Sequence, residues 1–283
     1  MPTSSPPHPV ALTIAGSDSG GGAGIQADLK AMHAHGVFGM SVLTAITAQN
    51  SHAVTAAYDL PTDLVTAQID AVAEDFAIHA VKTGMLSSSV LIDAVADGIE
   101  RHGLGPVVVD PVMISKSGFS LLKPEAVAAV KARMLPLARL VTPNTHEAEA
   151  LTGQPVRTLD DAQEAAAAIH AMGPQAVLVK GGHLLLDGEA EPDAVDVLFD
   201  GTAFAFFRSP RIDTPHTHGT GCTYASAIAA GLARGFDLAV AVGRAKAYLT
   251  EAIRQALPLG QGHGPVHHFW HLDAEQAVAL TGP

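Results

Sequence analysis

The 283-residue sequence is poor in cysteine and in basic residues, and it lacks a long apolar run. Cys222 is the only cysteine, so the chain forms no internal disulfide, which suits a reducing compartment. Lys and Arg number 16 against 28 Asp and Glu, giving a formal net charge of −12, and we therefore expect no nucleic-acid partner. No run of about 18 apolar residues occurs, so we expect no membrane span.

The first nine residues, MPTSSPPHP, contain neither a basic region nor a long apolar core. We therefore expect no signal peptide and a cytoplasmic protein. Their proline content predicts a disordered tail over residues 1–9. The rest of the chain shows no linker, repeat or low-complexity block, so we expect residues 10–283 to form one domain.

Short apolar runs alternate with segments of helical spacing along most of the chain. This alternation predicts βαβ units and an α/β fold with a mostly parallel sheet flanked by helices. The Asp200-Gly201 pair predicts a two-residue turn and hence an antiparallel hairpin late in the chain. Predicted strands are 10–15, 39–47, 53–58, 80–83, 106–109, 140–142, 176–180, 195–199 and 202–207; predicted helices are 25–35, 61–74, 89–101, 124–134, 144–151, 160–172, 220–233 and 238–257.

The stretch from Thr214 to Ala233 joins a glycine-rich turn to an alanine-rich helix. The first N–H groups of a helix have no internal partner and attract anions, and glycine lets the backbone approach an anion closely. Gly219, Thr220 and Gly221 therefore offer an oxyanion cradle. Cys222 follows in the first helical turn, where a thiol is easier to deprotonate. The alternative is a plain glycine-rich loop before a core helix.

The sequence lacks the motifs of several other nucleotide-binding families, although an earlier glycine loop resembles one of them. Residues 22–27, GAGIQA, fit the dinucleotide-binding fingerprint, which also requires an acidic residue about 20 positions later. No Asp or Glu lies between Asp28 and Asp59, so this role is disfavoured. The sequence also contains no GxxxxGK[ST] and no HRD or DFG motif, which excludes a Walker-type NTPase and a protein kinase.

Polar residues follow several of the predicted strands, where ligands of open α/β sheets bind. Asn144 and Glu147 stand three apart at a helix start, a spacing that suits either a Mg²⁺ site or helix capping. Asp110 ends a buried strand and either helps to hold a metal or begins a turn. Lys180 either meets a phosphate or is an ordinary exposed lysine. The 15 histidines show no metal-ligand spacing, and we expect His268 to be at the surface or partly packed.

Taken in order, eight motifs resemble those of the bifunctional hydroxymethylpyrimidine/phosphomethylpyrimidine kinases of thiamine biosynthesis, in the ribokinase-like superfamily. The motifs are TIAGSDSGGGAGIQADLK, TAQN, VKTGM, VVDPVM, KSG, TPNxxEA, VKGGH and THGTGC, and the resemblance covers about residues 10–270. It implies a single α/β domain without a separate lid, usually dimeric. It also implies ATP-dependent phosphorylation of 4-amino-5-hydroxymethyl-2-methylpyrimidine and then of its monophosphate.

The same resemblance implies the site residues. Gln49 stands at the position that reads the aminopyrimidine edge, to which a primary amide is matched as donor and acceptor. Cys222 stands where the sugar kinases carry an aspartate base. The other implied positions are Gly16, Asp28 and Met85 for the substrate; Lys180, Asn144 and Thr214 for ATP; Glu147, Asn144 and Asp110 for Mg²⁺; and Gly219, Thr220 and Gly221 for the transferring group.

Two positions depart from the family pattern: Gly20 replaces a serine found in many relatives, and His216 replaces an asparagine. The second departure lies near the expected nucleotide and affects its contacts. Two other functions remain open at this point. A cousin branch with the same glycine-cysteine motif phosphorylates pyridoxal, although Gln49 favours a pyrimidine. A non-catalytic pyrimidine or nucleotide binder would keep the same pocket.

Overall fold

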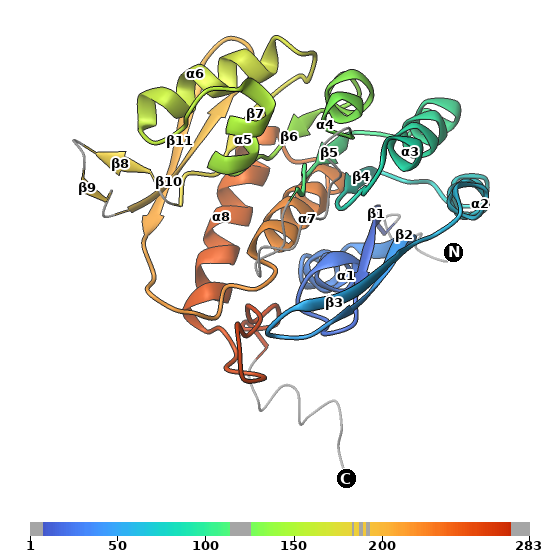
Figure 1. Ribbon diagram of the computed structural model, residues 1–283, viewed down its shortest axis with the longest axis horizontal. Helices are drawn as coiled ribbons and strands as arrows, with labels where there is room; N and C mark the ends of the chain where they lie inside the picture. Colours follow the sequence, from blue (N-terminus) through green and yellow to red (C-terminus); the bar gives the residue numbers. More distant parts are fainter. Residues whose placement is uncertain (1–7, 114–125, 183, 187–188, 191–192, 273–283) are drawn as a thin grey trace, which may run out of the picture.

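The computed structural model describes residues 8–113, 126–182, 184–186, 189–190 and 193–272. Over these residues, nine strands form one sheet with helices on both faces (Figure 1), as the predicted α/β fold requires. Most of the predicted tail 1–9, and residues 273–283 of the predicted domain, lie outside the described residues.

The elements follow the predicted alternation of strand and helix. The strands are β1 (Val10–Asp18), β2 (Phe38–Gln49), β3 (Val54–Asp59), β4 (Ala80–Thr83), β5 (Val107–Val109), β6 (Leu140–Val141), β7 (Val177–Val179), β8 (Leu185–Leu186), β9 (Glu189–Ala190), β10 (Asp193–Phe199) and β11 (Phe204–Pro210). The helices are α1 (Gly24–Ala34), α2 (Thr62–Ala73), α3 (Ser89–His102), α4 (Ala126–Ala129), η1 (Val130–Met134), α5 (Thr145–Thr152), α6 (Leu159–His170), α7 (Thr220–Ala233) and α8 (Leu238–Arg254).

The main sheet has the order β11-β10-β7-β6-β5-β4-β1-β2-β3. The six strands from β7 to β2 are parallel, and the predicted late hairpin of β10 and β11 adds antiparallel strands at one edge. The opposite edge is also antiparallel, because β3 returns directly alongside β2. This second antiparallel edge was not predicted, since the sequence of a strand alone does not specify the direction in which it pairs.

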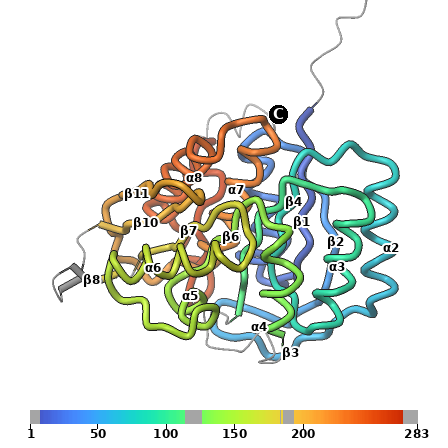
Figure 2. The backbone as a smooth tube through the Cα atoms, turned by 90° about the horizontal axis from the view of Figure 1, so that it is seen from above, coloured from blue at the N-terminus to red at the C-terminus, as the bar shows by residue number. Residues whose placement is uncertain are grey.

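The helices cover the two faces of the sheet because the central strands are apolar on both sides. Val107 and Val109 of β5 pack with α2–α6 on one face, and Val108 between them packs with α7 and α8 on the other. Figure 2 shows α7 and α8 on one side of the strands, and α5 and α6 on the other side. This layering leaves the ends of the parallel strands available for the site.

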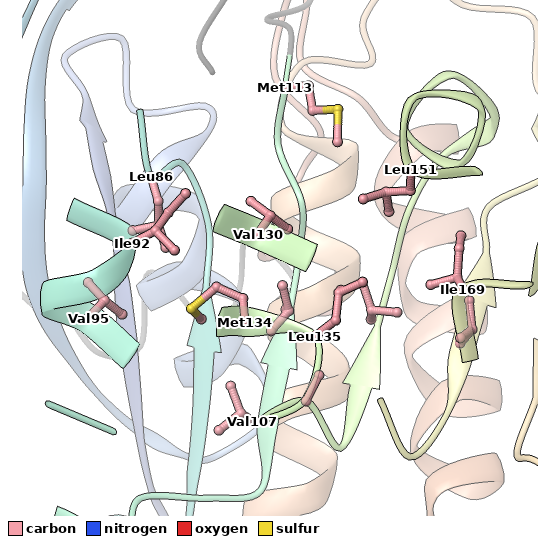
Figure 3. Close-up of a cluster of buried hydrophobic side chains, with 14 of the residues drawn as sticks. Leu86, Ile92, Val95, Val107, Met113, Val130, Met134, Leu135, Leu151 and Ile169 are labelled. Atoms are coloured by element: carbon pink, nitrogen blue, oxygen red, sulfur yellow. The ribbon is translucent and has the colours of Figure 1, made fainter. Parts of the chain in front are cut away.

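The larger core includes a segment of π-helix. The predicted helix over residues 124–134 is observed from Ala126, first as one turn of α-helix and then as the π-helical η1. Figure 3 shows Val130 and Met134 of η1 among Ile92 and Val95 of α3 and the neighbouring strand residues. The wider π turn differs from the predicted α-helix, and its apolar face nevertheless fills the core.

Two local differences from the predictions concern turns. The hairpin between β10 and β11 pairs Phe199 with Phe204, so its loop has the four residues 200–203 rather than two. Asp200 closes this loop by accepting hydrogen bonds from the N–H groups of Thr202 and Ala203, both at 2.8 Å. The short pair β8 and β9 was not predicted. Among the described residues, every helix is too short or too polar to cross a bilayer.

Candidate active site

Two glycine-rich loops pack against each other at the start of α7. Gly219 has a φ of +81°, and a Cβ atom on it would lie 1.7 Å from the carbonyl oxygen of Gly22. A side chain at this position is therefore excluded by both conformation and contact. This fit places the THGTGC turn directly against the first glycine loop, which leads from β1 into α1.

The N-terminus of α7 also lies beside a half-buried cation. A Cβ atom on Gly221 would lie 3.5 Å from Nζ of Lys180 and 3.6 Å from Oδ2 of Asp110. Lys180 in turn donates to Oδ1 of Asp110 at 2.8 Å. The open N–H groups of a helix and an ammonium thus converge on one spot, which is the arrangement that binds a phosphate.

Asn144 and Glu147 form the capping box that the sequence offers as one of two alternatives. The Asn144 side chain accepts from the N–H of Glu147 at 2.9 Å, and Glu147 accepts from the N–H of Asn144 at 2.8 Å. The same Glu147 carboxylate lies 3.9 Å from Nζ of Lys180. Capping therefore aims this buried carboxylate at the lysine, and the two alternatives are compatible.

The charges around Lys180 are unbalanced. Burial raises the pKa of Glu147. The ammonium of Lys180 lowers this pKa in part, and the nearby carboxylate of Asp110 raises it further. Burial also disfavours the charged form of Lys180, but Asp110 and Glu147 outweigh it and raise the pKa of the ammonium. Two carboxylates that share one lysine have acceptor capacity left for a hard cation, so these residues fit a Mg²⁺ ion that completes its shell with waters and phosphate oxygens. The described residues contain no cluster of three or more His, Cys, Asp or Glu side chains that could hold a metal ion.

Gln49 belongs to a chain of polar contacts that reaches the THGTGC turn. Its Oε1 accepts from Thr47 at 3.2 Å, and its Nε2 lies 3.4 Å from Nε2 of His218. Nε2 of His218 also lies 2.8 Å from Oδ2 of Asp18, at the end of β1. Asp18 accepts further hydrogen bonds from the N–H groups of Gly20, Gly22 and Ala23. Because Nε2 of His218 donates to Asp18, the amide of Gln49 lies beside the imidazole rather than bonded to it, next to both glycine loops.

Burial works against the charge of Asp18, but the hydrogen bond to His218 and the loop N–H groups outweigh it, so the pKa of this carboxyl is lowered. An ionised Asp18 is the acceptor that holds the first glycine loop in place. Sequence reasoning missed both Asp18 and His218 as site residues. Their position inside two quoted motifs, SDSGGGAG and THGTGC, was the available signal.

Gly16 and Met85, two positions that the family resemblance implies for the substrate, are neighbours. A Cβ atom on Gly16 would lie 2.5 Å from Cε of Met85, and β1 is irregular between Ala15 and Ser17 at this point. The backbone oxygen of Met85 accepts from Oγ1 of Thr44 at 2.9 Å. Gly16 therefore makes room for the methionine at the ends of β1 and β4.

Asp28, the third implied substrate position, has no exposed surface at all. Its carboxylate accepts from Nζ of Lys82 at 2.9 Å through each oxygen, and from the hydroxyls of Thr13 and Ser226 at 2.6 and 2.7 Å. These partners occupy both oxygens in this structure. The carboxylate of Asp28 here supports the site from below, and the substrate contact that the resemblance implies for it stays a prediction.

Cys222 lies in the first turn of α7, as predicted, but its thiol does not ionise easily. Burial raises the pKa of the Cys222 thiol to about 11, although the nearby ammonium of Lys82 acts in the opposite direction. The expectation that the start of the helix eases deprotonation is therefore wrong for this structure. The desolvation of the thiol exceeds the favourable field of the helix terminus.

The C-terminal segment of the described chain completes the site. His218 pairs with this segment through two backbone hydrogen bonds, donating to Gly264 and accepting from Val266. Nδ1 of His216, which replaces the asparagine of many relatives, accepts from the N–H of Gly264 at 3.0 Å. Thr214, an implied ATP contact, is half-buried and accepts from the N–H of His216 at 3.2 Å.

His268 is 4% exposed, contrary to the expectation of a surface or partly packed residue. Its Nε2 lies 2.9 Å from Oγ1 of Thr223 in α7. Burial, together with the positive charge of Lys30, lowers the pKa of His268 to about 4. This neutral histidine anchors the tail to the helix that carries the glycine cradle.

The fold and the site together define an α/β phosphate-binding enzyme. A helix N-terminus and a lysine converge at the carboxyl ends of its central strands. The chain belongs to the phosphomethylpyrimidine kinase family, whose family model matches residues 18–267.

Individual relatives agree with this assignment. The chain is 52% identical over 271 residues to a hydroxymethylpyrimidine/phosphomethylpyrimidine kinase of Streptomyces coelicolor, covering 96% of this chain and 98% of the relative. The solved phosphomethylpyrimidine kinase of Clostridium difficile is 47% identical with a TM-score of 0.75, over 86% of this chain and 99% of that one. A pyridoxal kinase of Bacillus subtilis, solved as an ADP complex, is 42% identical with a TM-score of 0.84, over 92% and 97% of the two chains.

Proposed function

We propose that this protein transfers phosphate from ATP to the hydroxymethyl group of 4-amino-5-hydroxymethyl-2-methylpyrimidine, and then a second phosphate to the monophosphate product. Membership of the phosphomethylpyrimidine kinase family supports this assignment. The observation that carries it is the convergence of Gly221, Lys180 and Asp110 at the start of α7. Gln49 lies beside His218 of the same turn, which supports a pyrimidine beside the phosphate site.

Phosphoryl transfer requires positioning and charge neutralisation more than covalent chemistry. We assign the N–H groups of Gly219 and Gly221 to the transferring phosphate, and Lys180 to the ATP phosphates. The N–H of Thr220 between the two glycines donates to the carbonyl of Thr217, so Thr220 is assigned to holding the turn. Asn144 and Thr214 are assigned to contacts with ATP. Bound Mg²⁺ would neutralise phosphate charge, held through water or directly by Asp110, Glu147 and Asn144.

On the substrate side, Gln49 is assigned to the adjacent donor and acceptor of the aminopyrimidine, and Met85 to its ring. Cys222 is assigned to the alcohol proton. A thiol with a pKa of about 11 is ionised in only about one molecule in ten thousand at pH 7. A base role for Cys222 therefore depends on the charges that surround it once the ligands are bound.

An alcohol panel tests the reaction. ADP release is measured with the hydroxymethylpyrimidine, its monophosphate, pyridoxal and a ribonucleoside, each with and without Mg²⁺. We expect Mg²⁺-dependent turnover with the first two and at least tenfold lower kcat/KM with pyridoxal. Preference for pyridoxal would reassign the chain to the cousin activity, which the similarity to the Bacillus subtilis pyridoxal kinase makes the second candidate. Binding without turnover of any alcohol would identify a non-catalytic binder.

We also propose that the protein is a cytoplasmic homodimer. The ribbon of β2 and β3 supports a dimer, because Phe38, Ile46 and Tyr58 on it are 55%, 49% and 68% exposed. Ile46 and Tyr58 are direct cross-strand neighbours. Analytical ultracentrifugation of the wild type and of Tyr58→Asp tests this, with a dimer expected for the first and a monomer for the second. A monomeric wild type would contradict the proposal.

A further inference from the structure

Beneath the site lies an ion pair whose side chains are both inaccessible to solvent. Nζ of Lys82 in β4 lies 2.9 Å from each carboxylate oxygen of Asp28 in α1, and both side chains are 0% exposed. A buried ion pair of this kind is rarely the cheapest way to fill a core, because an apolar pair of similar volume is often as stable. Neither the ammonium of Lys82 nor the carboxylate of Asp28 has a role in the reaction steps assigned above.

The ion pair is directed toward the catalytic end of α7. Ser226 donates to Oδ1 of Asp28 at 2.7 Å, and it follows Cys222 by four residues on the same helix. Residues four apart lie on one face of a helix, so the carboxylate lies one turn below the thiol. A Cβ atom on Gly84 would lie 2.7 Å from Nζ of Lys82, so the ammonium also lies against the backbone that leads into Met85.

The charge of Lys82 acts strongly here because its side chain is inaccessible to solvent, which would otherwise screen it. Burial disfavours the charged ammonium, but the carboxylates of Asp28 and Asp110 outweigh it, and the pKa of Lys82 is raised. The charged groups that act on the Cys222 thiol are the cations Lys82 from β4 and Lys180 after β7, and the carboxylates Asp28 from α1 and Asp110 after β5. The backbone N–H of Gly24 at the start of α1 also favours the thiolate. Of the two cations, Lys82 is the one that is inaccessible to solvent, whereas the Lys180 side chain is 15% exposed.

We propose that Lys82, held in place by Asp28, is a positioning residue that supplies the fixed positive charge under Cys222 and thereby favours its thiolate. The proposal deepens the function proposed above, since it gives Cys222 the means to accept the alcohol proton. It gives a reason for a fully buried lysine beside the backbone that leads into Met85.

The single cysteine allows a test that does not depend on catalysis. Below the pKa of a thiol, its alkylation rate is proportional to the thiolate fraction. The rate of modification by iodoacetamide is measured on the intact protein at pH 7.5, 8.5 and 9.5. We expect Lys82→Met to lower this rate at least tenfold at each pH, and Asp28→Asn to leave it unchanged or raise it. A fall in Lys82→Met without a fall in Asp28→Asn is the signature of charge, because damage to packing by either variant would change the exposure of the thiol in one direction.

Three controls accompany the measurement. Lys246→Met removes another buried lysine, which pairs with Asp196 at 2.7 Å, and it is expected to change the rate less than twofold. All variants must react equally in urea. If Lys82→Met alone does not fold, the double variant Lys82→Met/Asp28→Asn is compared with Asp28→Asn, and the double variant is expected to be at least tenfold slower.

Two results would overturn the proposal. One is an unchanged alkylation rate in folded Lys82→Met or in the double variant. The other is a parallel fall in Lys82→Met and Asp28→Asn, which would assign the pair a structural role. Neither result would bear on the pyrimidine kinase activity of the wild type, which the alcohol panel measures separately.

Discussion

Nε2 of His218 lies 2.8 Å from Oδ2 of Asp18, a contact between residues 200 positions apart in the chain. Asp18 also holds three N–H groups of the first glycine loop, and His218 also lies 3.4 Å from the amide of Gln49. A single carboxylate therefore fixes one loop directly and orients the neighbour of the proposed pyrimidine-reading residue.

Asp18→Asn is expected to raise the KM for the pyrimidine about tenfold and to leave the KM for ATP within twofold. The neutral side chain of the variant cannot accept a charge-assisted hydrogen bond from His218 and the loop N–H groups. A hydrogen bond to a charged group typically contributes about 1.5–3 kcal/mol. Steady-state kinetics with both substrates measures the two constants. Asp200→Asn is the matched control, because Asp200 closes the distant β10–β11 loop in the same manner. Equal loss of both substrates in Asp18→Asn would contradict the prediction.

Gln49→Ala is expected to lower kcat/KM for the pyrimidine by about 10²-fold with little change in ATP affinity. A site built to pair with a substrate amino group loses much of its discrimination when the partner is removed. Competition between the pyrimidine and pyridoxal in the same assay measures that discrimination. Parallel loss of ATP binding would mean that Gln49 is structural.

Gly219→Ala and Gly221→Ala are expected to fail in different ways. At Gly219 the new Cβ would meet the Gly22 oxygen at 1.7 Å, so we expect a misfolded or strongly destabilised protein. At Gly221 the new Cβ meets only Lys180 and Asp110 at ordinary contact distances, so we expect a normal thermal midpoint. The methyl group would nevertheless occupy the phosphate position, with a fall in kcat of about 10²–10³, by analogy with loss of an oxyanion-hole donor. A fully active Gly221→Ala would remove the cradle assignment.

Cys222→Ala is expected to reduce kcat by at least about 10²-fold, the usual contribution of a general base, and to leave ATP binding nearly unchanged. Calorimetric titration with a non-hydrolysable ATP analogue measures the binding. Cys222→Ser, which keeps a hydroxyl in place of the thiol, separates loss of the base from loss of volume. Full activity in the alanine variant would end the proposal that Cys222 accepts the proton.

His268 gives the protein a specific sensitivity to acid. Its folded-state pKa of about 4 lies below the ordinary histidine value of 6.5, so the unfolded chain binds the proton more readily. The stability that depends on neutral His268 is present above pH 6.5 and is lost as the pH falls toward 4. We expect this single group to lower the unfolding free energy by about 2 kcal/mol between pH 7 and pH 5.

Urea unfolding at the two pH values measures this loss, and His268→Gln should lose about 2 kcal/mol less than the wild type over the same interval. His267→Gln is the neighbouring control and should behave like the wild type. Identical pH dependence in wild type and His268→Gln would show that another group carries the acid sensitivity.

The order and type of most elements could be predicted because they depend on local patterns. The apolar runs around Val107 and Val177 are typical of strands buried on both faces. Gly219-Thr220-Gly221 before an alanine-rich segment is typical of a turn that leads into a helix. The Asn144–Glu147 box also depends on residues three apart, and it is present.

Features that depend on distant residues could not be predicted in this way. The antiparallel edge at β3, the partnership of Asp28 with Lys82, and the contact of Asp18 with His218 each join segments whose approach is decided by the packing of the whole sheet. The Cys222 thiol illustrates the same limit. Its place in the helix can be read locally, but its desolvation comes from strands and helices elsewhere in the chain.

The docking of residues 264–266 onto His218 has a consequence for synthesis on the ribosome. The strands of the sheet all precede residue 211, but the histidine that borders Gln49 receives its backbone partners only once residues 264–266 have been made. A nascent or prematurely terminated polypeptide can therefore assemble much of the sheet while the alcohol-binding half stays unfinished. Both glycine loops acquire their final arrangement only after residues 264–266 have docked onto His218.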